Sequence, residues 1–326
     1  MDEDGSKGVR RRAGREREHA FWPMVLLLGV CAATGPGQWG LAQDPASAPD
    51  AGARRCAMGW NLRAVVGSDV KDIRAAVDVW LVELGRMEGL RAESRMYTNM
   101  RDMLRDLKAG KLDIVSGTAL DYLGICKNVE VELAFVGVRQ GRKAHSYRVL
   151  VHGDSGIMDV AGLKGKRLAV KHGEEMGRLY LNTLLLRHGM REAPSCFSTV
   201  VEKGKFSQAV LAVFFGQADA CVVTEGVLDT MIALNPQIGQ RLKVLASSPR
   251  FVAQISFFRK EYDADARRSV VERALSLTGS APGRQLLTLF RLDRLGLVKE
   301  SDLDTVRDLL GEYERLGGRC CATAGD

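Results

Sequence analysis

The chain has 326 residues, of which 46% are hydrophobic, 27% charged and 6% aromatic, and its formal net charge is +7. This composition excludes a collagen-like, wholly disordered or small disulfide-stapled protein, and the length predicts about two domains. The basic residues do not form a stripe with interleaved aromatic residues, so nucleic acid is not expected as a partner.

The first 42 residues have the layout of an export signal. Six Lys and Arg residues between Lys7 and Arg17 precede an apolar run, Phe21–Ala33, and small residues follow up to Ala42. This order is typical of a secretory signal peptide, and 13 apolar residues are too few for a membrane-spanning helix, which needs about 20. We therefore expect cleavage near Ala42, a periplasmic protein, and a flexible leader over residues 43–57.

The cysteine spacing predicts no metal site. Six cysteines remain after residue 42, and none has CxxC or metal-ligand spacing: Cys56, Cys126, Cys196, Cys221, Cys320 and Cys321. An exported protein can form disulfides, so Cys56 could pair with Cys320 or Cys321, whereas the other three are equally well explained as buried free thiols. No metal and no cofactor is expected.

From residue 60 onward, short strand-like runs alternate with helical ones. The pattern predicts strands at Leu62–Val66, Arg91–Met96 and Leu112–Val115. Each strand is followed by a predicted helix, at Val70–Leu84, Asn99–Ala109 and Thr118–Leu123. This alternation is typical of parallel strands with helices on both faces of the sheet.

Two extended stretches, Ser146–Val151 and Phe251–Phe258, lack matching helices. A second alternating block lies between them and includes a predicted helix at Glu174–His188. After residue 260 the pattern is almost wholly helical. We therefore predict an α/β protein with two lobes, each a mostly parallel sheet flanked by helices, joined as a hinged clamshell by two crossing strands. The first lobe comprises residues 58–146 and 248–326, and the second comprises residues 147–247.

Four segments have recognisable motifs in a consistent order. In Tyr97–Leu123 a helix is followed by Leu-x-x-Gly-x-x-Asp and a strand, and Ser146–Val170 is an extended stretch with Asp-Ser-Gly-Ile and Leu-Lys-Gly-Lys. Ala209–Val223 contains Gly-x-Ala-Asp-Ala, and Leu245–Glu261 is a second extended stretch. Together they resemble the phosphate-, phosphite- and phosphonate-type periplasmic solute-binding proteins of ABC transporters. The resemblance implies the type II periplasmic-binding-protein fold. It also implies a small, polar, anionic ligand that is held in a cleft between the lobes and delivered to a transporter permease.

The expected ligand site lies at the turns from strands into helices, because free helix N–H groups at the carboxyl ends of strands favour an anion. The candidate ligand-binding residues are Ser68, Asp69, Tyr97, Ser116, Gly117, Thr118, Tyr147, His172, Gly173, Glu174, Thr224 and Glu225. For the hydroxyl and carboxyl groups the alternative role is helix capping, and for Tyr97 and His172 it is a place on the surface.

One turn departs from the family pattern. Where the family has a Ser-Thr-Ser-type run, this chain has Val170–Gly177, which contains Glu174 and Glu175. If these carboxylates faced the cleft, they would repel a dianion by an amount that could reach several kcal/mol. Two interpretations are open: the carboxylates cap a helix and face solvent, or the ligand has changed, for example to one with an amine.

Two other functions share this fold. A sensor module that hands a ligand signal to a membrane kinase is scarcely separable by sequence from a transport protein. An enzyme would need a nucleophile with its base or a metal cluster, and the chain has no G-x-S-x-G, H-E-x-x-H or P-loop lysine motif. We expect a monomeric, non-enzymatic binding protein that partners an ABC permease.

Overall fold

A computed structural model describes residues 54–62, 74, 75, 77–79, 81 and 90–318 of the chain. The predicted signal peptide, the candidate ligand residues Ser68 and Asp69, and Cys320 and Cys321 lie outside the described residues. Among the residues that are described, no helix is long and apolar enough to cross a membrane.

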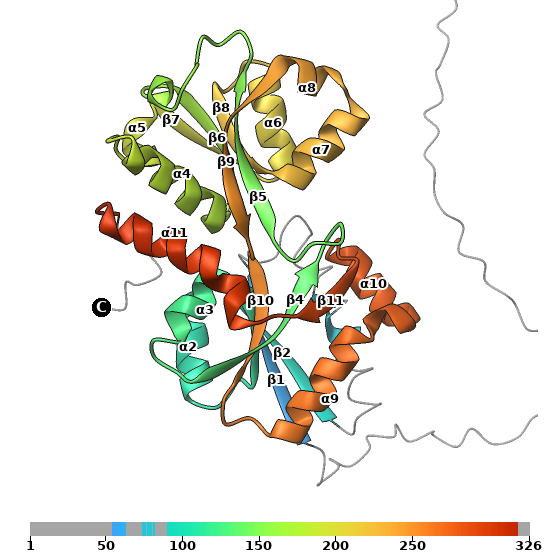
Figure 1. The fold of residues 1–326 in the computed structure, drawn as a ribbon. Helices are drawn as coiled ribbons and strands as arrows, with labels where there is room; N and C mark the ends of the chain where they lie inside the picture. Colours follow the sequence, from blue (N-terminus) through green and yellow to red (C-terminus); the bar gives the residue numbers. More distant parts are fainter. Residues whose placement is uncertain (1–53, 63–73, 76, 80, 82–89, 319–326) are drawn as a thin grey trace, which may run out of the picture. The chain divides into compact units, whose positions relative to one another are not determined.

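The first sheet has six strands in the described residues, in the order β11-β4-β10-β3-β1-β2 (Figure 1). These strands are β1 (Arg54–Asn61), β2 (Leu90–Tyr97), β3 (Ile114–Thr118), β4 (Val131–Val138), β10 (Gln254–Arg259) and β11 (Arg294–Leu297). β1 pairs in parallel with β2 and β3, whereas β10 runs antiparallel to β3 and β4, and β11 runs antiparallel to β4. The helices of this part of the chain are α2 (Met100–Lys108), α3 (Ala119–Ile125), α9 (Ala264–Leu275) and α10 (Ala281–Leu289).

The predicted flexible leader ends earlier than expected. The sequence predicts a leader up to residue 57, but β1 already begins at Arg54 and covers Arg54–Asn61. Of the strand predicted at Leu62–Val66, residues 63–66 lie outside the described residues. β1 belongs to the sheet because it lies between β2 and β3. Three of its residues are fully buried there: Cys56, Ala57 and Met58.

The second sheet has five strands within the described part of the chain, in the order β7-β6-β8-β5-β9. They are β5 (His145–His152), β6 (Arg167–Lys171), β7 (Thr199–Lys203), β8 (Ala220–Thr224) and β9 (Leu242–Phe251). β6 pairs in parallel with β7 and β8, and β5 runs antiparallel to β8 and β9. The helices between these strands are α4 (Glu175–Arg187), α5 (Ala193–Cys196), α6 (Phe206–Phe214), α7 (Glu225–Leu234) and α8 (Gln237–Arg241).

The predicted α/β class with two sheets is confirmed, but both sheets are mixed rather than mostly parallel. Parallel neighbours need a crossover connection, usually a helix, and the pairs made by β5, β9, β10 and β11 are antiparallel. The predicted crossing strand Phe251–Phe258 is in fact the end of β9 and most of β10, separated by Val252 and Ala253. The predicted lobe boundaries at residues 146 and 247 therefore fall inside β5 and β9. β11 also interrupts the expected helical C-terminal part.

The chain passes between the sheets twice, from β4 to β5 through residues 139–144 and from β9 to β10 through residues 252–253. A third link is α11 (Asp304–Arg315), which packs against α4 beside the second sheet and against α3 beside the first (Figure 1). Arg187 of α4 forms an ion pair with Glu312, and the Tyr313 hydroxyl donates to Glu192 at 2.6 Å. The C-terminal helix therefore connects both halves of the fold.

Strand ends bring the starts of two helices together beside β5. Tyr147 on β5 is paired in register with Thr224, the last residue of β8, and α7 begins at the next residue. β6 ends at Lys171, and α4 begins a few residues later at Glu175. Tyr147 is only 2% exposed, so its ring is a fixed support between these two helix starts.

Candidate functional site

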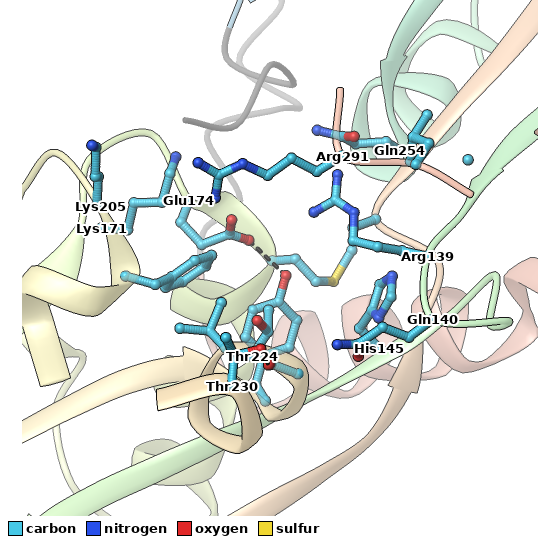
Figure 2. Close-up of a pocket in the computed structure, with 18 of the residues that line it drawn as sticks. Arg139, Gln140, His145, Lys171, Glu174, Lys205, Thr224, Thr230, Gln254 and Arg291 are labelled. Carbon is cyan, nitrogen blue, oxygen red and sulfur yellow. Dashed lines mark hydrogen bonds between the residues drawn. The ribbon is translucent and has the colours of Figure 1, made fainter. Parts of the chain in front are cut away.

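A cavity of about 530 Å³ lies where the connections between the two sheets meet the starts of α4, α6 and α7 (Figure 2). The first sheet, its helices and the connecting segments contribute Thr118, Leu120, Gly137, Arg139, Gln140, Lys143, Ala253, Gln254, Arg291, Leu292 and Asp293. The second sheet and its helices contribute His145, Tyr147, Lys171, Gly173, Glu174, Glu175, Met176, Lys205, Phe206, Ser207, Thr224, Gly226, Val227, Thr230, Met231 and Leu234. A volume of this size is typical of a small-molecule site, which spans roughly 300–1,000 Å³.

The charged side chains of the cavity are mainly basic. Five Lys and Arg residues line it against three acidic residues. Lys143 is paired with Asp302 at 3.2 Å, and Asp293 accepts the backbone N–H of Gly141 at 2.8 Å, so these two groups have partners of their own. The field inside the cavity therefore favours an anionic ligand.

Two arginines, Arg139 and Arg291, extend into the cavity (Figure 2). The Arg139 Nη2 donates to the Phe290 carbonyl at 3.0 Å, but its buried Nε has no hydrogen-bond partner in the described part of the chain. Among the described residues, neither guanidinium has a carboxylate within ion-pair distance. Burial and the like charge of Arg291 lower the pKa of Arg139. The charges of Asp293 and Glu174 oppose this lowering, but neither carboxylate bonds to the Arg139 guanidinium. An anion placed between the two guanidinium groups would supply a direct acceptor to both.

The backbone at the arginine pair is strained. Among the described residues, only Gln140 (φ +51°) and Arg291 (φ +54°) are non-glycine residues with positive φ, and both line the cavity. Such a conformation costs about 1–3 kcal/mol and is found preferentially at functional sites. The Gln140 side chain lies close to Gly226 at the start of α7. A Cβ at Gly226 would lie 2.6 Å from the Gln140 Oε1, so this close approach requires glycine.

The start of α4 is occupied by the protein's own carboxylate. Glu174 is the N-cap residue, its side chain accepts from the Gly177 N–H at 3.5 Å, and the Tyr147 hydroxyl donates to it at 2.7 Å (Figure 2). A Cβ at Gly177 would lie 3.1 Å from the Tyr147 ring, so the absence of a larger residue lets the ring approach the helix. Burial raises the pKa of Glu174, and burial together with the Glu174 charge raises the pKa of Tyr147.

The structure combines parts of the two interpretations: Glu174 caps α4, but it does not face solvent as the first interpretation had it. The side chain is half-buried and lines the cavity, because its hydrogen bond to the buried Tyr147 turns the carboxylate toward β5. Glu175 also lines the cavity. An anion therefore cannot use the α4 N-terminus as it would use an uncapped helix.

The other helix starts differ in whether they are capped. α3 has a complete capping box, in which Thr118 accepts from the Asp121 N–H at 3.0 Å and Asp121 accepts from the Thr118 N–H at 2.8 Å. α7 begins after Thr224, whose hydroxyl makes no capping hydrogen bond. α6 begins after Lys205, whose side chain has no acceptor for the first-turn N–H groups, although Gln208 accepts the Lys205 N–H at 3.2 Å. The helix starts at α6 and α7 therefore keep N–H groups available beside the cavity.

Five candidate ligand residues line the cavity: Thr118, Tyr147, Gly173, Glu174 and Thr224. Another five do not. Ser116 and Gly117 line a second cavity of about 90 Å³ inside the first sheet, where the Ser116 hydroxyl lies 2.6 Å from that of Ser256.

The remaining three candidates have partners elsewhere. The Tyr97 hydroxyl donates to Asp106 at 2.8 Å, and His172, with a side chain 77% exposed, is bonded to Glu202. Glu225 accepts from the Ser146 hydroxyl at 2.8 Å and from Arg148 at 2.9 Å, which turns its carboxylate away from the cavity. These three side chains are placed by local ion pairs and hydrogen bonds rather than by the cavity.

Sequence reasoning missed the basic residues of the cavity and one histidine. Arg139 lies in a short turn rich in arginine between two extended stretches, and that placement at a crossing is a signal that could have been used. Arg291 has no such signal, because it reaches the cavity only through the pairing of β11 with β4. His145 also lines the cavity, and burial and the charges of Arg139 and Arg142 lower its pKa.

The described residues contain no group of three or more His, Cys, Asp or Glu side chains that could hold a metal ion. The described cysteines are free thiols. Cys56 is fully buried in β1, and burial raises its pKa to about 11.

Residues 67–303 match a protein family described as the periplasmic substrate-binding protein of the phosphonate ABC transporter. The chain belongs to this family. It is therefore a substrate-binding protein of an ABC transporter, and the family is periplasmic, binds a small molecule and partners a permease. No curated protein matches the chain.

Solved structures show the same fold. A binding protein component of an ABC phosphonate transporter from Pseudomonas aeruginosa has a TM-score of 0.59 at 12% identity, over 81% of this chain and 88% of that one. PhnD1 from Prochlorococcus marinus, in complex with methylphosphonate, has a TM-score of 0.58 at 14% identity, over 82% and 99%. A Xanthomonas citri protein bound to ATP has a TM-score of 0.62 at 16% identity, over 81% and 98%.

Proposed function

We propose that the cavity captures a small organic anion with a phosphonate- or phosphate-like head group and that the protein delivers it to its permease without catalysing a reaction. The observation that supports this most directly is the pair of cavity arginines, Arg139 and Arg291, which have no carboxylate partner among the described residues. Family membership supports the transport role, and the basic excess of the cavity supports the sign of the ligand charge.

In this proposal the head group binds at the hinge rather than at α4. Arg139 lies in the β4–β5 connection and Arg291 in the segment before β11, while Lys205 and Thr224 approach from the starts of α6 and α7. Guanidinium groups bind oxyanions through paired N–H donors, and the free N–H groups of the two helix starts add further donors. A ligand that contacts both halves of the fold stabilises the closed arrangement, because it binds that arrangement better than an open one.

Binding of methylphosphonate and inorganic phosphate to the mature chain, residues 43–326, measured by isothermal titration calorimetry, tests this proposal. Truncating one partner of a buried charged contact costs about 2–5 kcal/mol, so Arg139→Gln and Arg291→Gln should each weaken binding by about 30-fold or more. The control is Arg268→Gln, an exposed residue of α9 paired only with Asp265, which should bind as the wild type does. Failure of every oxyanion to bind, or unchanged affinity in both variants, would contradict the proposal.

We further propose that the signal peptide is cleaved near Ala42 and that the exported protein is a monomer. The basic, apolar and small-residue segments of the first 42 residues support export, as does membership of a periplasmic family. N-terminal sequencing of protein from a periplasmic extract, with light scattering of the same sample, tests both statements.

A further inference from the structure

One side of the cavity is an apolar helix face. Val227, Thr230, Met231 and Leu234 of α7 line the cavity at positions i, i+3, i+4 and i+7, which share one face of a helix. The Thr230 hydroxyl donates to the Gly226 carbonyl at 2.7 Å, so it offers the cavity no free donor. This face therefore contributes apolar surface to the site.

The face extends from the interior of the cavity to its opening. Met231 is 9% exposed, whereas Leu234, one turn further along α7, is 82% exposed. Phe206 and Met176, at the starts of α6 and α4, are buried residues that also line the cavity. A single exposed leucine is unremarkable, but one that continues an apolar row out of a ligand cavity indicates a surface that an occupant covers.

The head group uses only part of this space. Figure 2 shows Arg139 and Arg291 on one side of the hydrogen bond at Glu174, and Thr224 and Thr230 on the other. A cavity of about 530 Å³ is of the size that holds drug-sized ligands rather than a one-carbon oxyanion. Further charged groups, Lys171, Glu174 and Lys205, line the starts of α4 and α6, whereas α7 contributes a mainly apolar face.

We infer that the ligand is an amphiphilic anion, with an oxyanion head at Arg139 and Arg291 and an apolar substituent of several carbons that lies along the α7 face. The inference rests on the proposed function, because the arginine pair fixes where the head lies. Phosphonates and phosphate monoesters share this head-group chemistry. A tail that extends past Met231 toward Leu234 would remove both side chains from water when the ligand binds.

The test is the affinity of the mature chain for a series of n-alkylphosphonates, methyl, butyl and hexyl, measured by isothermal titration calorimetry. Each buried methylene should tighten binding about fourfold until the tail passes Leu234. In Leu234→Gln the affinity for hexylphosphonate should fall about tenfold, while that for methylphosphonate should not change. Because Leu234 is exposed, this substitution leaves the fold intact. Leu297→Gln, at a 51% exposed leucine of β11 outside the cavity, is the matched control.

The outcomes separate the inference from the proposed function. If methylphosphonate binds through the arginines but affinity does not rise with chain length, the amphiphilic ligand is refuted and the anion site stands. If affinity rises but Leu234→Gln leaves the series unchanged, the placement of the tail on α7 is refuted. If no alkylphosphonate binds, both the inference and the proposed function fail.

Discussion

Replacing Glu174 with Gln tests whether the carboxylate at the start of α4 opposes the ligand. The amide keeps an oxygen that can accept from the Tyr147 hydroxyl and the Gly177 N–H, so the cap remains and only the charge is removed. If the Glu174 carboxylate and the phosphonate head group are treated as two unit charges about 7 Å apart, at an effective dielectric constant of about 20, they repel each other by about 2 kcal/mol. We therefore expect Glu174→Gln to bind methylphosphonate about 30-fold more tightly than the wild type at pH 8.

The assay is calorimetric titration of wild type and variant at pH 8, with Glu272→Gln on the exposed surface of α9 as the control for a general change in net charge. Stability gives a second readout. Because burial raises the pKa of Glu174, its ionised form is disfavoured in the folded state, and the variant should be at least as stable as the wild type at pH 8. A loss of methylphosphonate affinity in the variant would refute the repulsion, because methylphosphonate has no cationic group that the Glu174 carboxylate could attract.

Three further predictions concern the scaffold. Burial raises the pKa of Asp121 to about 6, above its unfolded value of 3.8, so ionisation of this group should lower wild-type stability by about 2 kcal/mol as pH rises from 4 to 7. Urea melts of Asp121→Asn should lack that loss. Leu309→Ala on the buried face of α11 should cost about 2–4 kcal/mol in the same assay, whereas removing the partly exposed ion pair with Arg187→Gln should cost less than about 1 kcal/mol. Iodoacetamide should label the exposed Cys126 before the buried Cys221, because burial also raises the pKa of Cys221. Mass spectrometry of the native protein measures the order, and labelling of Cys221 first would contradict the burial of this residue.

Much of the second half of the fold could be predicted because its pattern is local. The helix predicted at Glu174–His188 is α4 to within a residue, since apolar residues and a capping carboxylate define it within one segment. β1 could not be found in the same way. Its side chains alternate little, and Arg54 and Arg55 at its start are atypical of a central strand. Only its place between β2 and β3 explains the strand.

The candidate site likewise contains residues that a local pattern predicts and residues that only long-range packing brings together. Thr118 and Thr224 were found because each ends a strand and precedes a helix, and Glu174 was found because it lies in the turn from β6 into α4. Both patterns are visible in the sequence. Arg139 and Arg291 are far apart in the chain, and they meet because β11 pairs with β4 in the register Arg294 to Val138. That register depends on long-range packing, which no local pattern encodes.

The two findings at α4 and at the arginine pair explain each other. A helix N-terminus that has its own carboxylate is already neutralised, so it attracts an external anion less than an uncapped one does. The charge that the ligand needs must then come from side chains, and two arginines of the cavity supply it. Arg139 lies in the connection from β4 to β5, and Arg291 lies between α10 and β11 with a left-handed backbone. In the proposed function, a head group bound at Arg139 would therefore contact a segment that joins the two halves of the fold, whereas binding at α4 would act through one half alone.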